Sequence, residues 1–406
     1  MTPPANERPA SARPETLETL RTIADRAGLA RIQLLAWREL ADPEAGGSEV
    51  HAHEVMRRWA AAGLAVTIRT SAAAGHPPVG HRDGYRAIRR GGRYSVFPRA
   101  AVSAATHRMG PRDGLVEIWN GVPFLSPVWD RGPHIAVVHH VHGPMWEMAL
   151  GRHLGRVGEW MERRIAPRFY RRTRIVTLSQ SSRDELVGDL GFDPEMVEVV
   201  PPGIDPRFAP GRPTSPTPLI VSVGRLAPVK RFDALIRSVA QVRDRHPHLR
   251  LVIAGEGTQR PVLEAEIARL GATDWVLLPG RVPDDELVEL FQQAWLVTSA
   301  SLVEGWGMTL TEAAACGTTA VASRTTGHLD AVADGVTGLL ADDDTELAGA
   351  IDRVLSDTEL RDRLSAAALE RSAQFSWDAT AEAILSTLAR AAADQPTKAR
   401  SRSRAT

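Results

Sequence analysis

The sequence predicts an α/β protein made of two doubly wound, Rossmann-like domains that face a central cleft. Both halves of the 406-residue chain contain short runs that are apolar throughout, which is typical of strands buried on both faces of a parallel sheet. Amphipathic helical stretches alternate with these runs, as in βαβ units. The proline-rich segment 209–218 separates the halves and cannot continue a helix or a central strand. A ligand cleft is expected at the carboxyl ends of the strands.

Ten apolar runs are expected to form the strands. Those of the first half are Ile32–Ala36, Val66–Ile68, Leu115–Trp119, Ile135–His139 and Ile175–Leu178. Those of the second half are Leu219–Val223, Leu251–Ala254, Val276–Leu278, Leu296–Thr298 and Thr319–Ala322. The first domain is thus expected to span 15–208, and the second 219–375.

The two ends of the chain are expected to lie outside these domains. Residues 1–14 carry four prolines and predict a disordered lead-in. Residues 393–406 form a basic tail without apolar periodicity, for which a solvated tail is the first interpretation and membrane or nucleic-acid contact the second. Its basic residues are Lys398, Arg400, Arg402 and Arg404.

Composition excludes several classes of protein. The 49 basic and 49 acidic side chains give a formal net charge of zero, which argues against a protein that coats nucleic acid. A single cysteine, Cys316, rules out an internal disulfide framework and fits a reducing compartment. No apolar stretch is long enough to span a membrane, and the N-terminus lacks the apolar region of a secretory signal. We therefore expect a soluble, cytoplasmic protein, with Cys316 packed in the core.

A phosphate-binding loop is predicted after the first strand of the second half. Gly224 directly follows that strand and allows a sharp turn toward the cleft, where Arg225 and Lys230 would stand as two fixed cations. Such a pair suits a diphosphate. Solvated surface charges are the alternative, but Lys230 and Lys398 are the only lysines in the chain, so a lysine inside the fold is not there by default.

A second anion site is predicted in the segment from Glu304 to Glu312, which follows the strand Leu296–Thr298. A helix is expected to start near Thr309, so the backbone N–H groups of Gly307, Met308 and Thr309 would point into the cleft. Glu304 and Glu312 flank this site. Carboxylates beside a phosphate site would repel it unless they accept hydrogen bonds from ribose or sugar hydroxyls.

The first half offers weaker signals. Gly46 and Gly47 precede a helix that ends near Gly63 and would allow a ligand to approach the helix start, with Ser48 as the N-cap. The cluster His139-His140-Val141-His142 ends a strand. A hydrogen-bonding histidine in the cleft is the first interpretation, packing or surface roles the second, and zinc the least favoured because no acidic residue or cysteine lies at ligand spacing nearby.

Two further segments have structural interpretations. Asp342-Asp343-Asp344 precedes a helix and is expected to cap it rather than to bind metal. The stretch Glu147–Arg172 predicts one or two amphipathic helices with a basic face. Packing on the N-terminal domain is its first interpretation, and contact with a membrane that carries a lipid-linked acceptor is the second.

Taken together, residues 30 to 390 resemble a retaining glycosyltransferase of family 4 with the GT-B fold. The strongest parts are Gly224-Arg225-Leu226 with Lys230, the Glu304-x7-Glu312 block, and the later segment from Gly327 to Leu340 that contains Asp334-Gly335. The resemblance implies a cytoplasmic enzyme of cell-envelope or secondary-metabolite glycosylation, and a last helix, 376–392, that crosses back to the N-terminal domain.

The resemblance also implies roles for the candidate residues. Arg225 and Lys230 would hold the donor diphosphate, Glu304 the donor sugar, Glu312 the ribose, and Gly46 and Gly47 the phosphate from the opposite domain. His139, seven residues before Trp146, falls where the family carries its strand-end histidine and is preferred over His140. The remaining donor-binding candidates are Gly255, Val282, Trp306, Gly307, Met308 and Thr309.

The implied reaction transfers a sugar from a UDP- or GDP-sugar to an unidentified acceptor hydroxyl, with retention and without metal or cofactor. The acceptor can be a glycan, a lipid-linked sugar or a small molecule. Two positions depart from the family, Asp330 in place of glutamate and Thr318-Thr319 in place of proline, and both are expected to lie where donor preference is set. A phosphorylase is disfavoured because no lysine remains for pyridoxal phosphate. An inverting transferase or an epimerase of the same fold should lack the two-glutamate block. A non-catalytic sugar-nucleotide-binding subunit stays the alternative.

Overall fold

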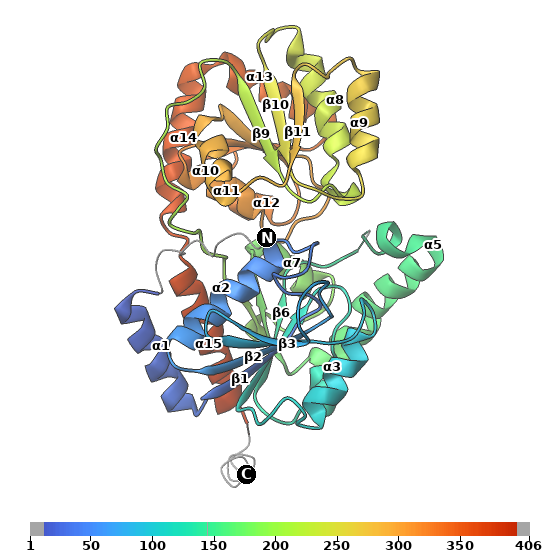
Figure 1. Ribbon diagram of the computed structural model, residues 1–406, viewed down its shortest axis with the longest axis vertical. Coiled ribbons are helices and arrows are strands. Elements are labelled where there is room, and N and C mark those ends of the chain that lie inside the picture. The colour runs from blue at the N-terminus through green and yellow to red at the C-terminus, as the bar shows by residue number, and fades with distance from the viewer. Residues whose placement is uncertain (1–11, 144, 396–406) are drawn as a thin grey trace. The chain divides into compact units, whose positions relative to one another are not determined.

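The computed structural model describes residues 12–143 and 145–395, and it contains two compact units (Figure 1). The first unit runs up to Val137 and also takes Arg172–Val176 and the chain from Trp377 onward. The second unit consists of Val138–Arg171 and Thr177–Ser376. Thus the segment after the predicted strand-end histidine and the segment before the proline-rich stretch both count with the second unit.

An eight-stranded sheet forms around the first unit, in the order β3-β4-β2-β1-β5-β6-β7-β8. β1 pairs in parallel with β2 and β5, β2 pairs in parallel with β4, and the short β3 pairs antiparallel with β4 at the edge. The strands are β1 (Arg31–Leu35), β2 (Ala65–Thr70), β3 (Val79–Arg82), β4 (Tyr85–Arg89), β5 (Gly114–Trp119), β6 (His134–Val138), β7 (Arg174–Thr177) and β8 (Val197–Val199).

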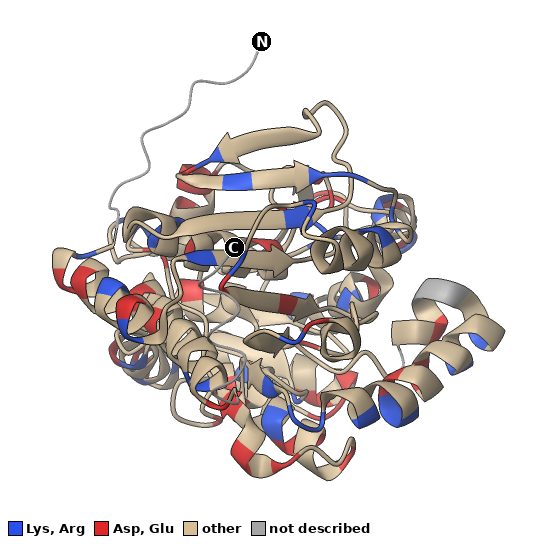
Figure 2. Ribbon diagram, turned by 90° about the horizontal axis from the view of Figure 1, so that it is seen from below, with Lys and Arg blue, Asp and Glu red and all other residues tan. Residues whose placement is uncertain are grey.

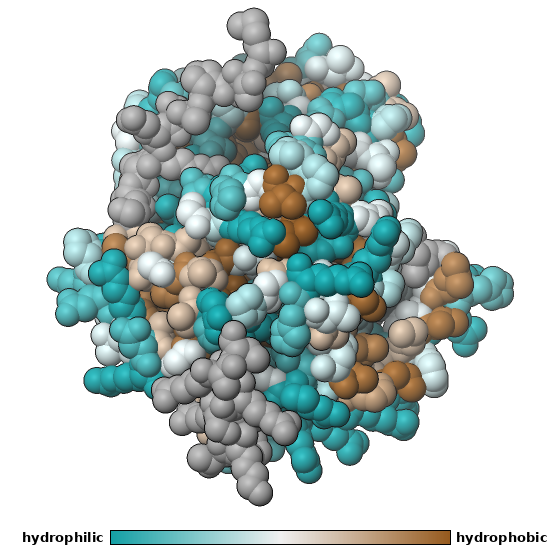
Figure 3. Space-filling view, turned by 60° about the horizontal axis from the view of Figure 1, so that its bottom comes forward, coloured by the Kyte–Doolittle hydropathy of each residue, from teal (hydrophilic) through white to brown (hydrophobic). Residues whose placement is uncertain are grey.

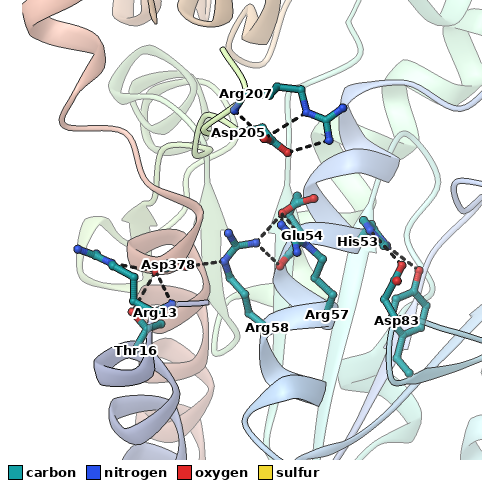
Figure 4. A network of polar contacts seen from close by, with 11 residues as sticks. Arg13, Thr16, His53, Glu54, Arg57, Arg58, Asp83, Asp205, Arg207 and Asp378 are labelled. Atoms are coloured by element: carbon teal, nitrogen blue, oxygen red, sulfur yellow. Dashed lines mark hydrogen bonds and ion pairs between the residues drawn. The ribbon is translucent and has the colours of Figure 1, made fainter. Parts of the chain in front are cut away.

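The helices of the first unit include the last helix of the chain, α15. They are α1 (Pro14–Ala27), α2 (Gly47–Ala61), α3 (Val96–Ala105), α4 (Ser126–Trp129) and α15 (Trp377–Ala393). Asp378 of α15 accepts hydrogen bonds from Arg58 of α2 (2.7 Å) and from the Thr16 hydroxyl of α1 (3.1 Å), as Figure 4 shows. Burial opposes ionisation of Asp378, but Arg58 and Arg13 outweigh it and lower its pKa. This buried ion pair therefore ties the C-terminal helix to the start of the chain.

The second unit contains a six-stranded sheet that is parallel throughout, in the order β11-β10-β9-β12-β13-β14. When the strands are numbered within the unit, this is the Rossmann order 3-2-1-4-5-6. The order in which successive strands are added to the sheet reverses between β9 and β12, and this place is the switch point of the sheet. The strands are β9 (Leu219–Val223), β10 (Arg250–Ala254), β11 (Val276–Gly280), β12 (Leu296–Ser299), β13 (Ala320–Ser323) and β14 (Gly338–Ala341). The apolar side chains of β9, β10, β12, β13 and β14 are mostly buried, as runs without alternation predict, whereas Leu277 of the edge strand β11 is 44% exposed.

The second unit also contains helices from two stretches of the chain, one before β9 and one after it. Those before β9 are α5 (Met145–Trp160), the π-helix η1 (Met161–Ile165), α6 (Ala166–Tyr170), α7 (Gln180–Gly188) and the 3₁₀-helix η2 (Pro194–Met196). Those after it are the 3₁₀-helix η3 (Pro228–Lys230), α8 (Phe232–Arg243), α9 (Arg260–Arg269), α10 (Asp284–Gln293), α11 (Met308–Ala315), α12 (His328–Ala331), α13 (Asp344–Ser356) and α14 (Thr358–Ser372).

All ten predicted strands are confirmed to within one or two residues at each end. The prediction missed four strands, β3, β4, β8 and β14. β4 has the sequence YRAIR, in which arginines interrupt the apolar run, and β8 has only three residues. Asp343 caps α13 by accepting bonds from the N–H groups of Thr345 and Glu346, as expected.

The ends of the chain and the proline-rich segment can be described only in part. Helix α1 already begins at Pro14, and Ala12 before it is buried, so the end of the predicted lead-in is ordered. Residues 1–11 and the basic tail from 396 lie outside the described residues. The segment 209–218 has no helix or strand, and the indole of Trp295 donates to the Ser215 carbonyl (2.8 Å), so this segment is fastened to the second unit.

Candidate functional site

The loops after β9 and β10 meet beside the switch point of the second sheet, which lies between β9 and β12. A Cβ on Gly255 would lie 1.9 Å from the Gly224 carbonyl oxygen, and one on Gly257 would lie 2.4 Å from the Leu226 carbonyl oxygen. Only glycine allows the two backbones to approach this closely. Gly255 thus lies beside the predicted phosphate loop, and because it has no side chain the loop can pass close to it.

Lys230 and Glu304 form an ion pair at this switch point. Lys230 ends the 3₁₀-helix η3 after β9, and Glu304 lies in the loop after β12. Oε1 of Glu304 accepts from Nζ of Lys230 and from the Ser301 hydroxyl (3.0 Å). The aliphatic stem of Lys230 passes over Gly224, whose missing side chain leaves room for it. Two predicted site residues 74 positions apart are therefore brought together.

Glu304 is ionised across the whole physiological pH range. Burial alone would raise its pKa, but the charge of Lys230 and its hydrogen bond, together with His328, lower the pKa to about 2. His328 was not predicted as a site residue. Its ring is fully buried, its Nδ1 lies 2.8 Å from the Ser323 carbonyl, and its Nε2 has no hydrogen-bond partner among the described residues. The sequence feature that could have pointed to His328 is its place directly after Gly327.

Helix α11 starts beside this pair, one residue before the predicted start at Thr309. Gly307 precedes it with φ of 99°, a conformation that favours glycine. The ring of His328 lies beside Gly307, where a Cβ would come within 3.0 Å of its Cδ2. The first N–H groups of a helix have no partner within it, so Met308 and Thr309 stand at the helix start as expected, and the binding of an anion there stays a prediction.

Glu312 lies on α11 in a different environment from Glu304. Burial and the nearby carboxylates of Asp205 and Asp284 raise its pKa to about 7, while Arg207 opposes this shift. Arg207 pairs with both Asp205 (3.2 Å) and Asp284. The upper part of Figure 4 shows the pair of Arg207 and Asp205. The sequence reasoning missed this cluster because its members come from distant parts of the chain.

The three histidines after β6 lie in one compact turn. His139 is buried, and its carbonyl oxygen would lie only 2.3 Å from a Cβ on Gly305. The rings of His140 and His142 stack with centroids 4.7 Å apart. Burial lowers the pKa of His140 to about 4, while the charge of Glu304 raises it and those of Lys230 and Arg225 lower it. The ring of His140 therefore lies within reach of the charges of Glu304 and Lys230. The backbone carbonyl of His139 instead lies beside Gly305, which follows Glu304.

A buried carboxylate holds this histidine turn in place. Glu162 of the π-helix accepts from the N–H groups of His142 (2.9 Å) and Gly143 (3.2 Å) and from the indole of Trp146 (3.0 Å). Burial raises the pKa of Glu162, and these three donors oppose the rise. Glu162 is thus a positioning residue that the sequence did not reveal, since a single glutamate in a basic amphipathic stretch gives no signal.

Other predicted residues of the second unit are placed as follows. Arg225 is exposed in the loop after β9, and Val282 is half-buried after β11. Trp306 is 4% exposed and packs edge-on against Phe375 (5.2 Å between ring centroids), so its side chain belongs to the core. Cys316 is buried in the same core cluster, as expected, and burial raises its pKa to about 12.

The two departures from the family have structural explanations. Asp330 accepts from the backbone N–H groups of Gln180 (2.8 Å) and Ser181 (3.0 Å) and from the Ser181 hydroxyl, so it caps the start of α7. The hydroxyls of Thr318 and Thr319 donate to buried carbonyl groups. These three side chains therefore make hydrogen bonds within the fold, and their effect on donor preference stays a prediction.

Gly46 and Gly47 belong to the first unit, where they start helix α2. Gly46 is the N-cap, and its N–H donates to the Glu49 carboxylate (2.7 Å). The prediction that Ser48 is the N-cap is wrong, because the N-cap lies two residues earlier, at Gly46, and the helix begins at Gly47. The two glycines nonetheless stand at a helix start, as expected.

The segment from α5 to α6 presents an apolar and basic surface. Burial of its apolar side chains against the N-terminal domain, the first interpretation, is wrong, since most of them face solvent. The exposed ones are Met148 (45%), Leu154 (63%), Val157 (53%), Trp160 (56%), Met161 (42%) and Phe169 (47%). Figure 3 shows brown surface on the side of the molecule where α5 lies, and Figure 2 shows basic residues along α5. We call this surface, 147–172, the α5 face.

The residues that the structure describes contain no group of three or more histidine, cysteine or acidic side chains placed to hold a metal ion. No helix among residues 12–143 and 145–395 is long and apolar enough to cross a membrane.

Two family models match adjacent parts of the chain. The model for Glycosyltransferase Family 4 matches residues 45–208, and that for Glycosyl transferases group 1 matches residues 207–371. Among curated proteins, the chain is 38% identical over 232 residues to the D-inositol 3-phosphate glycosyltransferase of Stackebrandtia nassauensis, and 36% identical over 250 residues to that of Acidothermus cellulolyticus. These matches cover 52% and 56% of this chain and equal shares of the two relatives, so the chain spans about half the length of the curated relatives it matches.

Solved structures share the fold. The sucrose-phosphate synthase of Thermosynechococcus elongatus superposes with a TM-score of 0.73 at 21% identity, over 87% of this chain and 97% of that one. HepE of Anabaena, solved in complex with UDP and glucose, superposes with a TM-score of 0.70 at 20% identity, over 89% and 100% of the two chains. The predicted fold class, two Rossmann-like domains of the GT-B type, is confirmed.

Proposed function

The chain belongs to glycosyltransferase family 4, and from this membership we propose that it transfers a sugar from a nucleotide diphosphate sugar to an acceptor hydroxyl, with retention at the anomeric carbon. The observation that carries the proposal is the ion pair of Lys230 and Glu304 at the switch point of the second sheet, beside the start of α11. Ligands of doubly wound sheets bind at the carboxyl ends of the strands at this point.

The charges around the switch point suit a diphosphate leaving group. As the glycosidic bond breaks, negative charge accumulates on the diphosphate, and donors fixed in advance stabilise that charge best. Lys230, Arg225 and the N–H groups of Gly307, Met308 and Thr309 supply such donors in this proposal. The Glu304 carboxylate holds Lys230 in position, so the cation need not reorganise when the charge develops.

The other side of the same cluster suits a sugar. Glu304 stays ionised and can accept hydrogen bonds from sugar hydroxyls, and the unpartnered Nε2 of His328 offers a further acceptor when Nδ1 donates to Ser323. Glu312 is proposed to bind the ribose, and Gly46 and Gly47 to approach the phosphate from the first unit. The retaining mechanism and the choice of UDP or GDP are parts of this proposal.

The acceptor is proposed to be a polyol or sugar hydroxyl. The relatives named D-inositol 3-phosphate glycosyltransferase make inositol phosphate the first acceptor to test. The α5 face is proposed to contact an anionic membrane surface from the cytoplasmic side, because exposed leucine, valine and tryptophan side chains alternate there with arginines. No metal is assigned a role, since the basic groups already compensate a diphosphate.

The experiment that tests the proposal is a thermal-shift panel of UDP-, GDP-, ADP- and dTDP-sugars, followed by assay of donor hydrolysis and transfer. A sugar nucleotide at 100 times its Kd should stabilise the protein by about 2.7 kcal/mol. Stabilisation with turnover supports the transferase. Stabilisation without hydrolysis or transfer would instead support the alternative, a non-catalytic sugar-nucleotide-binding subunit, and no stabilisation at millimolar concentration would refute both.

A further inference from the structure

A buried arginine lies at the carboxyl end of β2 in the first unit without a carboxylate partner among the described residues. Arg69 is 3% exposed, and its Nη1 donates to the carbonyl oxygens of Thr70 and Arg90 (2.6 Å to Arg90). These bonds use Nη1 alone. The Nε–Nη2 edge, which binds carboxylates and phosphates in a two-pronged manner, makes no hydrogen bond to the described residues. A buried cation in this condition is costly unless an anion compensates it.

Two more arginines stand next to Arg69. Arg90 directly follows β4, whose end is fixed to that of β2 by a hydrogen bond from the Arg90 N–H to the Thr70 carbonyl (3.0 Å). Arg99 comes from helix α3, and its Cδ would lie 3.4 Å from a Cβ on Gly91. Burial, together with the positive charges of Arg90 and Arg99, lowers the pKa of Arg69 to about 10. The three side chains therefore repel one another from three separate elements.

The nearby carboxylates are already engaged with other arginines. Glu39 pairs with Arg89 (2.6 Å), and Glu44 pairs with Arg38 (2.9 Å) and Arg93 (3.4 Å). Both glutamates lie in the loop after β1, which backbone hydrogen bonds tie to the end of β2 and which the indole of Trp37 joins to the Arg93 carbonyl after β4. The surplus of positive charge at this edge of the sheet is thus carried by Arg69, Arg90 and Arg99.

We propose that Arg69, Arg90 and Arg99 form an anion-binding subsite of the first unit, which recognises a phosphate carried by the acceptor. The three arginines stand at the carboxyl ends of the parallel strands β2 and β4, the edge at which doubly wound domains bind their ligands. Arg69 supplies the fixed, two-pronged contact, and the exposed Arg90 and Arg99 attract the anion and close over it. The assignment of this phosphate to the acceptor rests on the proposed function.

The test measures binding by isothermal titration calorimetry with D-myo-inositol 3-phosphate and with uncharged myo-inositol, both in the presence of saturating nucleotide to fill the donor site. Vesicles of phosphatidylcholine with phosphatidylinositol form a second arm, because the same phosphate can come from a lipid headgroup. The variants are Arg69→Gln, Arg90→Gln and Arg99→Gln. Arg26→Gln, an exposed arginine on α1 of the same unit, is the control.

We expect the full-length protein to bind one phosphorylated probe, soluble or in vesicles, at least tenfold more tightly than the uncharged one. Each cluster variant should lose about tenfold or more, as for a hydrogen bond between charged groups, while Arg26→Gln should be unchanged. Because Arg69→Gln can fail to fold, the exposed Arg90→Gln and Arg99→Gln decide the outcome. Equal affinity of these variants and the control would overturn the subsite. If the variants and the control have equal affinity but all of them bind nucleotide, the subsite is wrong and the proposed function still stands. If the unmodified protein does not bind nucleotide, the proposed function itself is refuted.

Discussion

Glu304 and Glu312 flank the start of helix α11, yet their carboxyl groups have pKa values on opposite sides of the ordinary one. Against the cost of burial, Lys230 lowers the pKa of Glu304 to about 2. Burial and the carboxylates of Asp205 and Asp284 raise the pKa of Glu312 to about 7. The two glutamates of the Glu-x7-Glu block therefore differ in charge state near neutral pH, and each difference has a measurable consequence.

Glu312→Gln is expected to stabilise the protein at pH 8 but not at pH 4. A carboxyl whose pKa is raised by folding costs stability above that raised pKa, and the cost vanishes below the ordinary value near 4.5. A shift to about 7 corresponds to at most about 3 kcal/mol. Thermal unfolding at both pH values measures this, with the exposed Glu286→Gln as control. A variant that is less stable than the natural protein at pH 8 would contradict the account of this cluster.

Alanine variants of the three histidines are expected to separate binding from transfer. His140 lies among the charges of Glu304, Lys230 and Arg225, and His139 is the histidine that the family resemblance favours. We expect His139→Ala to retain nucleotide affinity and to lose transfer, with His140→Ala and His142→Ala as comparisons. Titration of nucleotide beside steady-state kinetics measures both effects. If only His140→Ala impairs transfer, the choice of His139 is wrong.

The strands were predictable because parallel strands buried on both faces are apolar throughout, so the runs that become β9 and β12 stand out in the sequence. The start of α11 was also predictable, because Gly307 marks it in the sequence. β4 escaped prediction because two arginines interrupt its apolar residues, and the buried pair of Arg89 with Glu39 cannot be recognised without the fold.

Residues that act through tertiary contacts were not predictable. Lys230 was singled out from composition, but its pairing with Glu304 depends on the order of strands in the sheet. Glu162, which holds the histidine turn, and Asp330, which caps α7, meet their partners only after folding. Their sequence neighbourhoods contain nothing that distinguishes them from solvated acidic residues.

Transfer is expected to proceed without a metal ion. Arg225, Lys230 and the start of α11 already offer positive charge to a diphosphate. Treatment with EDTA should leave the rate of transfer unchanged, and added Mg²⁺ or Mn²⁺ should not raise it. Loss of turnover in EDTA, restored by either ion, would contradict the proposed mechanism at its centre.

The α5 face is expected to bind anionic vesicles. Leu154→Glu and Trp160→Glu replace exposed apolar side chains, so folding should be unaffected while affinity for phosphatidylcholine vesicles containing phosphatidylglycerol falls about tenfold. Val262→Glu, at an equally exposed apolar position on α9, is the matched control. Co-sedimentation at low and high salt measures binding. Equal sedimentation of all four proteins would remove the α5 face as a membrane contact.

The measurement that tests the central claim most directly is the kinetics of Lys230→Ala beside its nucleotide affinity. If Lys230 stabilises the departing diphosphate, its contribution grows as charge develops, so kcat should fall more than affinity. Loss of one such donor costs about 2.7–4 kcal/mol, or roughly 10²–10³ in rate. Lys230→Arg should recover part of this, because its fork differs in geometry from an ammonium. Circular dichroism and Tm control for folding, since the variant leaves Glu304 unpaired. The account predicts a folded Lys230→Ala protein that binds nucleotide but is nearly inactive; a folded variant with near-normal turnover would contradict it.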